Sequence, residues 1–363
     1  LMALGLMVVG IYAWRQSLIG MEGQQQQQQQ QLLSAESEEA LREFPREMQQ
    51  KILSYLDYHP TLVKFLIRSC VKLSQNNDRT VFSPDSQLLA SLQQGIGADL
   101  LSIVHVNIWD VNTQQYIAHL LKDDVVNDID VVKFSPDGKL LAVASWREID
   151  TGIEAYLRLW KVSDLKNNNS KEILNQVWPH MAIESMAFSP DSHLLLMGDS
   201  EGNAILFDIS NLNKIEEIWS DEEIGEGGQP VYVAFSPDGK LMVTAVSGKV
   251  LEDDDNVVQL WDISDRSNIK KIGDSFGQEI SDWLMRSISF SPDGKLIAII
   301  DRRRRNNPEL RQGHLWDIRN LNEEIREVSN EFSQEMIKDI VFSPDGKLVA
   351  IVSGGAIKLW NIE

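Results

Sequence analysis

Short apolar runs that alternate with one repeated polar turn organise most of this chain. The turn reads Phe-Ser-Pro-Asp, usually continued as Gly-Lys-Leu, and it occurs six times, beginning at residues 82, 134, 188, 235, 290 and 342. Pro fixes φ, Asp tolerates the bridge region, and Gly accepts the left-handed conformation, so the motif predicts a tight turn that joins two strands. The runs after the turn, such as KLLAVAS at 139–145, are almost continuously apolar, which is typical of strands buried on both faces.

A second signal follows each turn and consists of an aliphatic residue, an aromatic residue and usually Asp, as in LRLWKV and VQLWDI. These segments alternate in polarity and predict a third strand, and more polar stretches such as EEIW at 216–219 predict a fourth. The pair of signals recurs every 47 to 55 residues, which indicates repeats of one four-stranded unit arranged radially as the blades of a β-propeller. We expect structural roles for the third-strand aromatic residues and the turn aspartates, which are Trp109, Trp160, Phe207, Trp261, Trp316, Trp360, Asp85, Asp137, Asp191, Asp238, Asp293 and Asp345.

These two motifs resemble those of the WD-repeat family, whose blades end their third strand in Trp-Asp. The resemblance covers residues 80–363 and implies an all-β fold, a six-bladed propeller preceded by a short helical region. The family's Gly-His before the first strand is missing from most copies, with His180 as the nearest candidate, so we expect blades held mainly by packing. The last repeat ends after its third strand, and we therefore expect a closing strand near 66–74 in a propeller that spans 62–363.

Two of the six turns depart from the motif, with Ser86 and Ser192 where Gly is expected. A residue other than Gly in the left-handed conformation costs about 1 kcal/mol. The sequence therefore predicts that Ser86→Gly and Ser192→Gly each stabilise the fold.

The N-terminal part is not repetitive. Residues 1–14 are apolar without a break, with Tyr12 and Trp14 near their end and Arg15 directly after them. This pattern predicts the end of a transmembrane helix over residues 1–15. A signal-peptide core and a buried helix are the alternatives. Residues 16–61 predict a spacer rich in Gln followed by a helical linker. The chain begins with Leu1 rather than Met, so we expect a fragment. From the apolar segment we expect a membrane-anchored protein, on an undetermined side of the membrane, or else a cytoplasmic one.

Two further resemblances concern this N-terminal part. The order of an apolar helix, a Gln-rich spacer, a helical segment and WD repeats looks like the C-terminal portion of bacterial STAND-type NTPases, which implies a sensor arm of a larger signalling protein. The stretch FPREMQQKILSYLD at 44–57 resembles the opening of an F-box, which implies a substrate adaptor of a ubiquitin ligase. A stand-alone propeller enzyme is a third possibility.

Composition and motifs give little support to catalysis. The formal net charge of −20 argues against general nucleic-acid binding and favours protein partners. The single cysteine, Cys70, rules out an internal disulfide, and the six histidines lack metal-ligand spacing. No phosphate-binding loop or Gly-x-Ser-x-Gly motif is present. We therefore expect no cofactor and no metal, and a non-catalytic scaffold or sensor that binds proteins.

The loops between second and third strands are the candidate partner surface. The long loop of the second repeat carries Trp146, and that of the fifth carries Arg302, Arg303, Arg304 and Arg305. These arginines stand out on an acidic protein and could bind a carboxylate-rich or phosphorylated partner. The alternatives are mutual screening with the acidic loop of the fourth repeat, Asp253, Asp254 and Asp255, or a calcium site at those aspartates.

Overall fold

The computed structural model describes residues 80–96, 102–113, 115–121, 126–167, 171–221, 229–246, 258–277, 283–303, 311–321, 325–328, 337–343, 345–353 and 356–362. The predicted membrane segment at 1–15, the linker at 16–61 and the closing strand at 66–74 lie outside these ranges. Within the described ranges, no helix is both long enough and apolar enough to cross a membrane.

The chain divides into two compact units, Leu1–Asp124 and Val125–Glu363. The described part of the first unit is one antiparallel sheet, which we call blade 1, with its strands in chain order. Its strands are β1 (Thr80–Phe82), β2 (Leu88–Ile96), β3 (Ser102–Asp110) and β4 (Gln115–Leu120).

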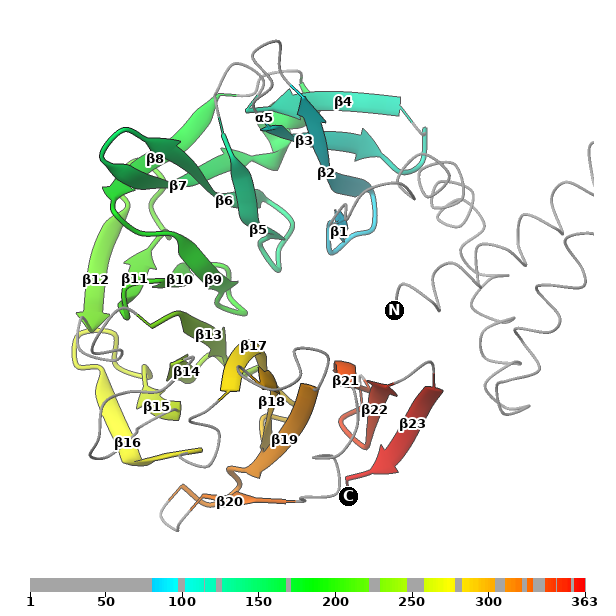
Figure 1. The fold of residues 1–363 in the computed structure, drawn as a ribbon, viewed down its shortest axis with the longest axis vertical. Coiled ribbons are helices and arrows are strands. Elements are labelled where there is room, and N and C mark those ends of the chain that lie inside the picture. Colours follow the sequence, from blue (N-terminus) through cyan, green and yellow to red (C-terminus); the bar gives the residue numbers. More distant parts are fainter. Residues whose placement is uncertain are drawn as a thin grey trace, which may run out of the picture. The chain divides into compact units, whose positions relative to one another are not determined.

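The second unit contains five more antiparallel sheets, blades 2 to 6, each with its strands in chain order (Figure 1). Blades 2 to 5 have four strands, and blade 6 has three within the described residues. Blade 2 consists of β5 (Asp128–Phe134), β6 (Leu140–Ile149), β7 (Gly152–Lys161) and β8 (Glu172–Pro179), with the short helix α5 (Val162–Lys166) after β7. Blade 3 consists of β9 (Ile183–Phe188), β10 (Leu194–Asp199), β11 (Ala204–Asp208) and β12 (Glu216–Asp221). Blade 4 consists of β13 (Val231–Phe235), β14 (Leu241–Val246), β15 (Val258–Asp262) and β16 (Lys270–Phe276). Blade 5 consists of β17 (Trp283–Phe290), β18 (Leu296–Arg303), β19 (Arg311–Asp317) and β20 (Arg326–Glu327). Blade 6 consists of β21 (Ile337–Phe342), β22 (Leu348–Ser353) and β23 (Ala356–Asn361).

The turn between the first and second strands of each blade is closed by the same three hydrogen bonds. In blade 2, the Ser135 hydroxyl donates to the Asp137 carboxylate at 2.7 Å and accepts from the Leu140 amide at 2.9 Å, and the Lys139 amide donates to Asp137 at 3.0 Å. Equivalent bonds occur in the other five turns. The Ser and Asp of the motif therefore satisfy main-chain donors that the tight turn would otherwise leave unpaired.

Both exceptional serines have the left-handed conformation that the motif requires, with φ of 56° at Ser86 and 62° at Ser192. They differ in what the hydroxyl does. The Ser192 hydroxyl accepts a hydrogen bond from the Asp137 amide of blade 2 at 3.0 Å, so it links two neighbouring turns. The Ser86 side chain is exposed, and the structure shows no such link for it.

We expect Ser86→Gly to raise the free energy of unfolding by about 1 kcal/mol, because the left-handed backbone is relieved at no other cost. Ser192→Gly should gain less, because it also removes a hydrogen bond that contributes about 0.5–1.5 kcal/mol. The sequence predicted that both substitutions stabilise the fold, and the structure now favours a smaller gain for Ser192→Gly. Denaturant unfolding of the two variants tests this, and a lower or unchanged midpoint for Ser86→Gly would contradict it.

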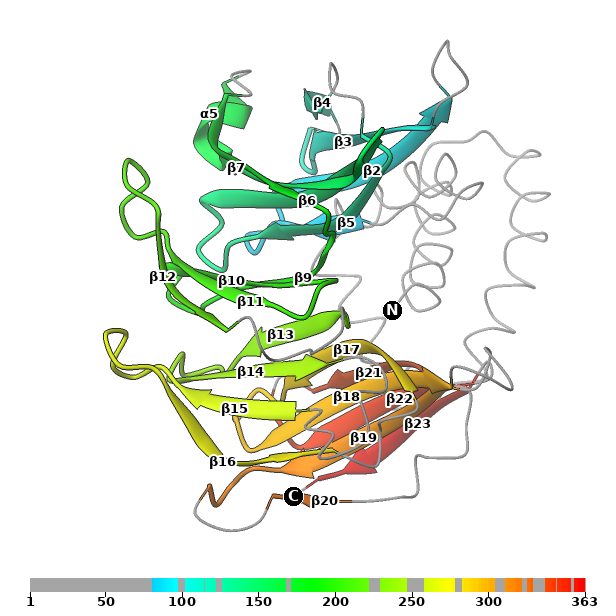
Figure 2. The same ribbon diagram turned by 60° about the vertical axis from the view of Figure 1, so that its left-hand side comes forward.

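Successive blades of the second unit lie face to face (Figure 2). Apolar clusters fill the space between each pair of neighbouring blades. The third-strand aromatic residue lies in the cluster shared with the preceding blade, as seen for Phe207, Trp261 and Trp316. Trp261 also donates its indole N–H to the buried Thr244 hydroxyl at 2.9 Å. The alternating pattern read in the sequence therefore becomes two buried faces per blade, one for each neighbour.

Candidate functional site

The hairpin of β6 and β7 in blade 2 is longer than its counterpart in the neighbouring blade. Both strands have ten residues, and their register continues to the pair Ile149 and Gly152. In blade 3 the corresponding strands, β10 and β11, have six and five residues. The tip of the blade 2 hairpin therefore continues past the end of the blade 3 hairpin against which its base packs.

Main-chain hydrogen bonds fasten this hairpin on both sides. The Asn127 amide donates to the Trp146 carbonyl at 2.9 Å, and the Glu148 amide donates to the Asn127 side chain at 2.8 Å. On the other side, the His180 amide donates to the Ile153 carbonyl at 2.6 Å. His180, the nearest candidate for the family's Gly-His, has φ of 63° and lies against Gly152 at the hairpin tip. The hairpin is therefore a supported element rather than a free loop.

One face of blade 2, formed by this hairpin and the adjoining strand β8, carries large apolar side chains that blade 3 does not fully cover. Trp146 and Trp178 lie on either side of Ala155 in register, and Ile153 follows on the same face. Ala155 is fully buried, whereas Trp146 and Trp178 are half-buried and Ile153 is 37% exposed. We call Trp146, Ile153 and Trp178 the Trp146 surface.

The opposite face of the same hairpin is charged. The Arg147 guanidinium contacts the Glu154 carboxylate at 2.7 and 2.9 Å, and the Tyr156 hydroxyl donates to that carboxylate at 2.7 Å. The bonds from Tyr156 and Arg147 lower the pKa of Glu154, and burial followed by the bond to Glu154 raises the pKa of Tyr156. The Arg158 guanidinium lies 4.4 Å from the Tyr156 ring centroid and donates to the Ser145 hydroxyl at 3.1 Å. The sequence analysis missed this cluster, although the alternation in GIEAYLRLWK places its acidic, aromatic and basic residues on one face.

The other predicted site residues are only partly described. Arg302 and Arg303 lie at the end of β18, where Arg302 pairs with Leu284 and Arg311 in register. Arg304, Arg305 and the three aspartates at 253–255 fall outside the described ranges, so the basic patch, its screening partner and the calcium site stay predictions. Within the described part of the chain, no group of three or more His, Cys, Asp or Glu side chains could hold a metal ion.

Comparison with known proteins agrees with the repeat architecture. The family model "WD domain, G-beta repeat" matches residues 111–160, 225–262 and 325–361, and each match ends at or one residue after a third-strand aromatic. Protein hir1 of Schizosaccharomyces pombe is 25% identical over 174 residues, which cover 46% of this chain and 17% of that protein. The chain thus spans under a fifth of the length of this curated relative.

Among solved structures, the hydrazine synthase of Kuenenia stuttgartiensis matches with a TM-score of 0.51 and 17% identity, over 78% of this chain and 76% of that chain. At this identity the match shows the fold alone. Together with the six antiparallel sheets and the WD repeats, it confirms the predicted class, an all-β, six-bladed, WD-repeat-like propeller.

Proposed function

We propose that this protein is a non-catalytic interaction scaffold that binds a protein partner at the Trp146 surface. The observation that carries the proposal is the incomplete burial of Trp146 and Ile153 on the supported hairpin and of Trp178 on the adjoining strand β8. Large aromatic side chains in partly buried positions are the usual centres of binding energy at protein interfaces, and WD repeats are typical of such scaffolds.

Two further features favour binding at this hairpin. The main-chain bonds at Asn127 and His180 hold the hairpin in place, so a partner would not have to order a loop before binding. The ion pair of Arg147 and Glu154 joins the two strands of the hairpin on the other face, so it supports the hairpin without forming part of the proposed surface.

Affinity capture after crosslinking in cells tests the proposal with matched variants. Trp146→Ala and Ile153→Ser should remove a defined set of partners, because both shorten apolar side chains of the proposed surface. Val177→Ser is the control, since Val177 is 45% exposed and pairs in register with Tyr156 on the charged face. If all three variants retain the partners of the unaltered protein while remaining folded, the Trp146 surface is not the docking site.

We also propose that the propeller is the sensing arm of a larger, membrane-linked signalling protein. The unbroken apolar stretch at 1–14, the arginine at 15 and the glutamine run at 24–31 support this arrangement. Reading the gene upstream of the Leu1 codon tests it: an NTPase domain and a completed apolar helix are expected. A start codon close by would instead favour the adaptor of F-box type.

A further inference from the structure

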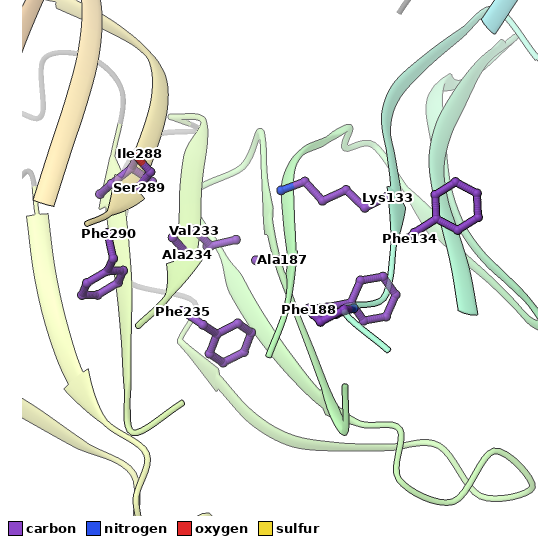
Figure 3. Close-up of a pocket in the computed structure, with 11 residues that line it drawn as sticks. Lys133, Phe134, Ala187, Phe188, Val233, Ala234, Phe235, Ile288, Ser289 and Phe290 are labelled. Carbon is purple, nitrogen blue, oxygen red and sulfur yellow. The ribbon is translucent and has the colours of Figure 1, made fainter. Parts of the chain in front are cut away.

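The first strands of blades 2 to 5 line an open cavity of about 350 Å³ (Figure 3). Each of these strands, β5, β9, β13 and β17, is the edge strand of its sheet. Among the side chains that line the cavity, Lys133 is the charged one, and its neighbours there include Ala187, Val233 and Ile288. Cavities of this volume are large enough to bind small organic molecules.

Lys133 occupies a repeated position, one residue before the Phe of the turn motif. The other five repeats carry small or apolar residues at this position, namely Val81, Ala187, Ala234, Ser289 and Val341. A lysine on an edge strand can serve to prevent pairing with another chain. That need does not explain Lys133, because β9, β13 and β17 are edge strands too and have no charge at the same position.

The Lys133 amine has no counter-ion among the residues that the structure describes. No carboxylate of the described residues lies within ion-pair distance of it, whereas Lys139 and Lys295 contact their turn aspartates at 2.9 and 3.0 Å. Water reaches the Lys133 side chain through the cavity, yet the surrounding blades desolvate the amine enough to lower its pKa. Bringing an anion to the amine would therefore stabilise its charged form.

We propose that this cavity binds a small monocarboxylate with a short aliphatic chain, held by Lys133. The carboxylate would form a charge-assisted hydrogen bond with the amine, which is stronger where water is partly excluded. The aliphatic chain would lie against Ala187, Val233 and Ile288, which are among the apolar residues that line the cavity. The lysine ammonium is a compact point charge, so it suits a ligand with a single negative charge such as a monocarboxylate.

Hexanoate is a suitable probe, with hexanamide as its uncharged analogue, and calorimetry on the full chain is the measurement. We expect one hexanoate bound per chain, and binding weaker by about tenfold or more for hexanamide and for the variant Lys133→Met. Lys139→Met is the matched control, because Lys139 is an exposed lysine on the turn of the same blade, and it should leave binding unchanged. Equal binding of hexanoate by Lys133→Met, or no binding at millimolar concentration, would overturn the proposal.

A second measurement tests the site in the unaltered sequence. After reductive methylation with ¹³C-formaldehyde, the methylated lysines report their own titration by NMR. Hexanoate should raise the pKa of Lys133 and leave the titration of Lys139 unchanged. A Lys133 titration that does not respond to hexanoate would contradict the site. It would leave the scaffold proposal standing, because that proposal is tested separately by partner capture with the Trp146→Ala and Ile153→Ser variants.

Discussion

Gly198→Ala is expected to destabilise the second unit by about 3 kcal/mol or more, at the upper end of the cost of overpacking a core. A Cβ at residue 198 would lie 2.3 Å from the Val231 carbonyl oxygen and 2.9 Å from its carbon. Gly198 belongs to β10 of blade 3, and Val231 begins β13 of blade 4. The obstructing atoms are main-chain atoms of the neighbouring blade, which cannot rotate aside as a side chain can. The two blades would have to separate, and the apolar cluster between them would lose contacts.

Gly273→Ala is the matched control for this variant. Gly273 has φ of 59°, but a Cβ there would meet nothing within 4 Å. Gly273→Ala should therefore cost only the strain of a residue other than Gly in the left-handed conformation, about 1 kcal/mol. The cost of Gly198→Ala comes instead from the overlap of the new Cβ with the Val231 main chain. Chemical denaturation of both variants separates the two effects. Equal losses of stability would show that blade 3 and blade 4 are not packed as closely as the structure indicates.

The sequence predicted the parts of the fold that depend on local chemistry. The turn motif specifies its own hydrogen bonds through Ser and Asp, and the apolar alternation specifies which strands are buried, so both could be read residue by residue. Gly198 could not be read in this way. Blades 2 and 4 have Ala144 and Ala245 at the same place, and only the position of Val231 in the next blade shows why blade 3 has no side chain there.

The candidate sites were harder to predict because they depend on what the neighbouring blade covers. Trp146 was selected from its loop, but its partners Ile153 and Trp178 depend on the shorter hairpin of blade 3. Lys133 was not selected from the sequence, because the sequence does not show that the described residues offer it no counter-ion. The closing strand lies outside the described residues and stays a prediction.

Acid should unfold this protein through its turn aspartates. The pKa of Asp238 is held below its usual range because, although burial alone would raise it, hydrogen bonds from the Ser236 hydroxyl and the Lys240 amide outweigh that effect. The turn aspartates of blades 2, 3, 5 and 6 are lowered in the same direction. A folded-state pKa below the unfolded value gives stability that is present above about pH 4 and is lost as the pH falls through the folded value. We therefore expect the melting temperature to fall by about 10 °C or more between pH 5 and pH 3.

The net charge allows this mechanism to be distinguished from simple repulsion. At −20 the folded chain repels itself at neutral pH, so protonating carboxylates between pH 7 and pH 5 should relieve repulsion and raise stability slightly. The turn aspartates act with the opposite sign, and they decide the outcome below pH 4 because protonation removes the charge that their hydrogen bonds favour. Asp238→Asn keeps an oxygen that can accept both bonds but does not titrate. It should lower stability at pH 7 and make the loss between pH 5 and pH 3 shallower, and the double variant with Asp293→Asn should make it shallower still. If melting curves across this range show the same slope for the unaltered protein and both variants, the acid sensitivity does not arise in the turns.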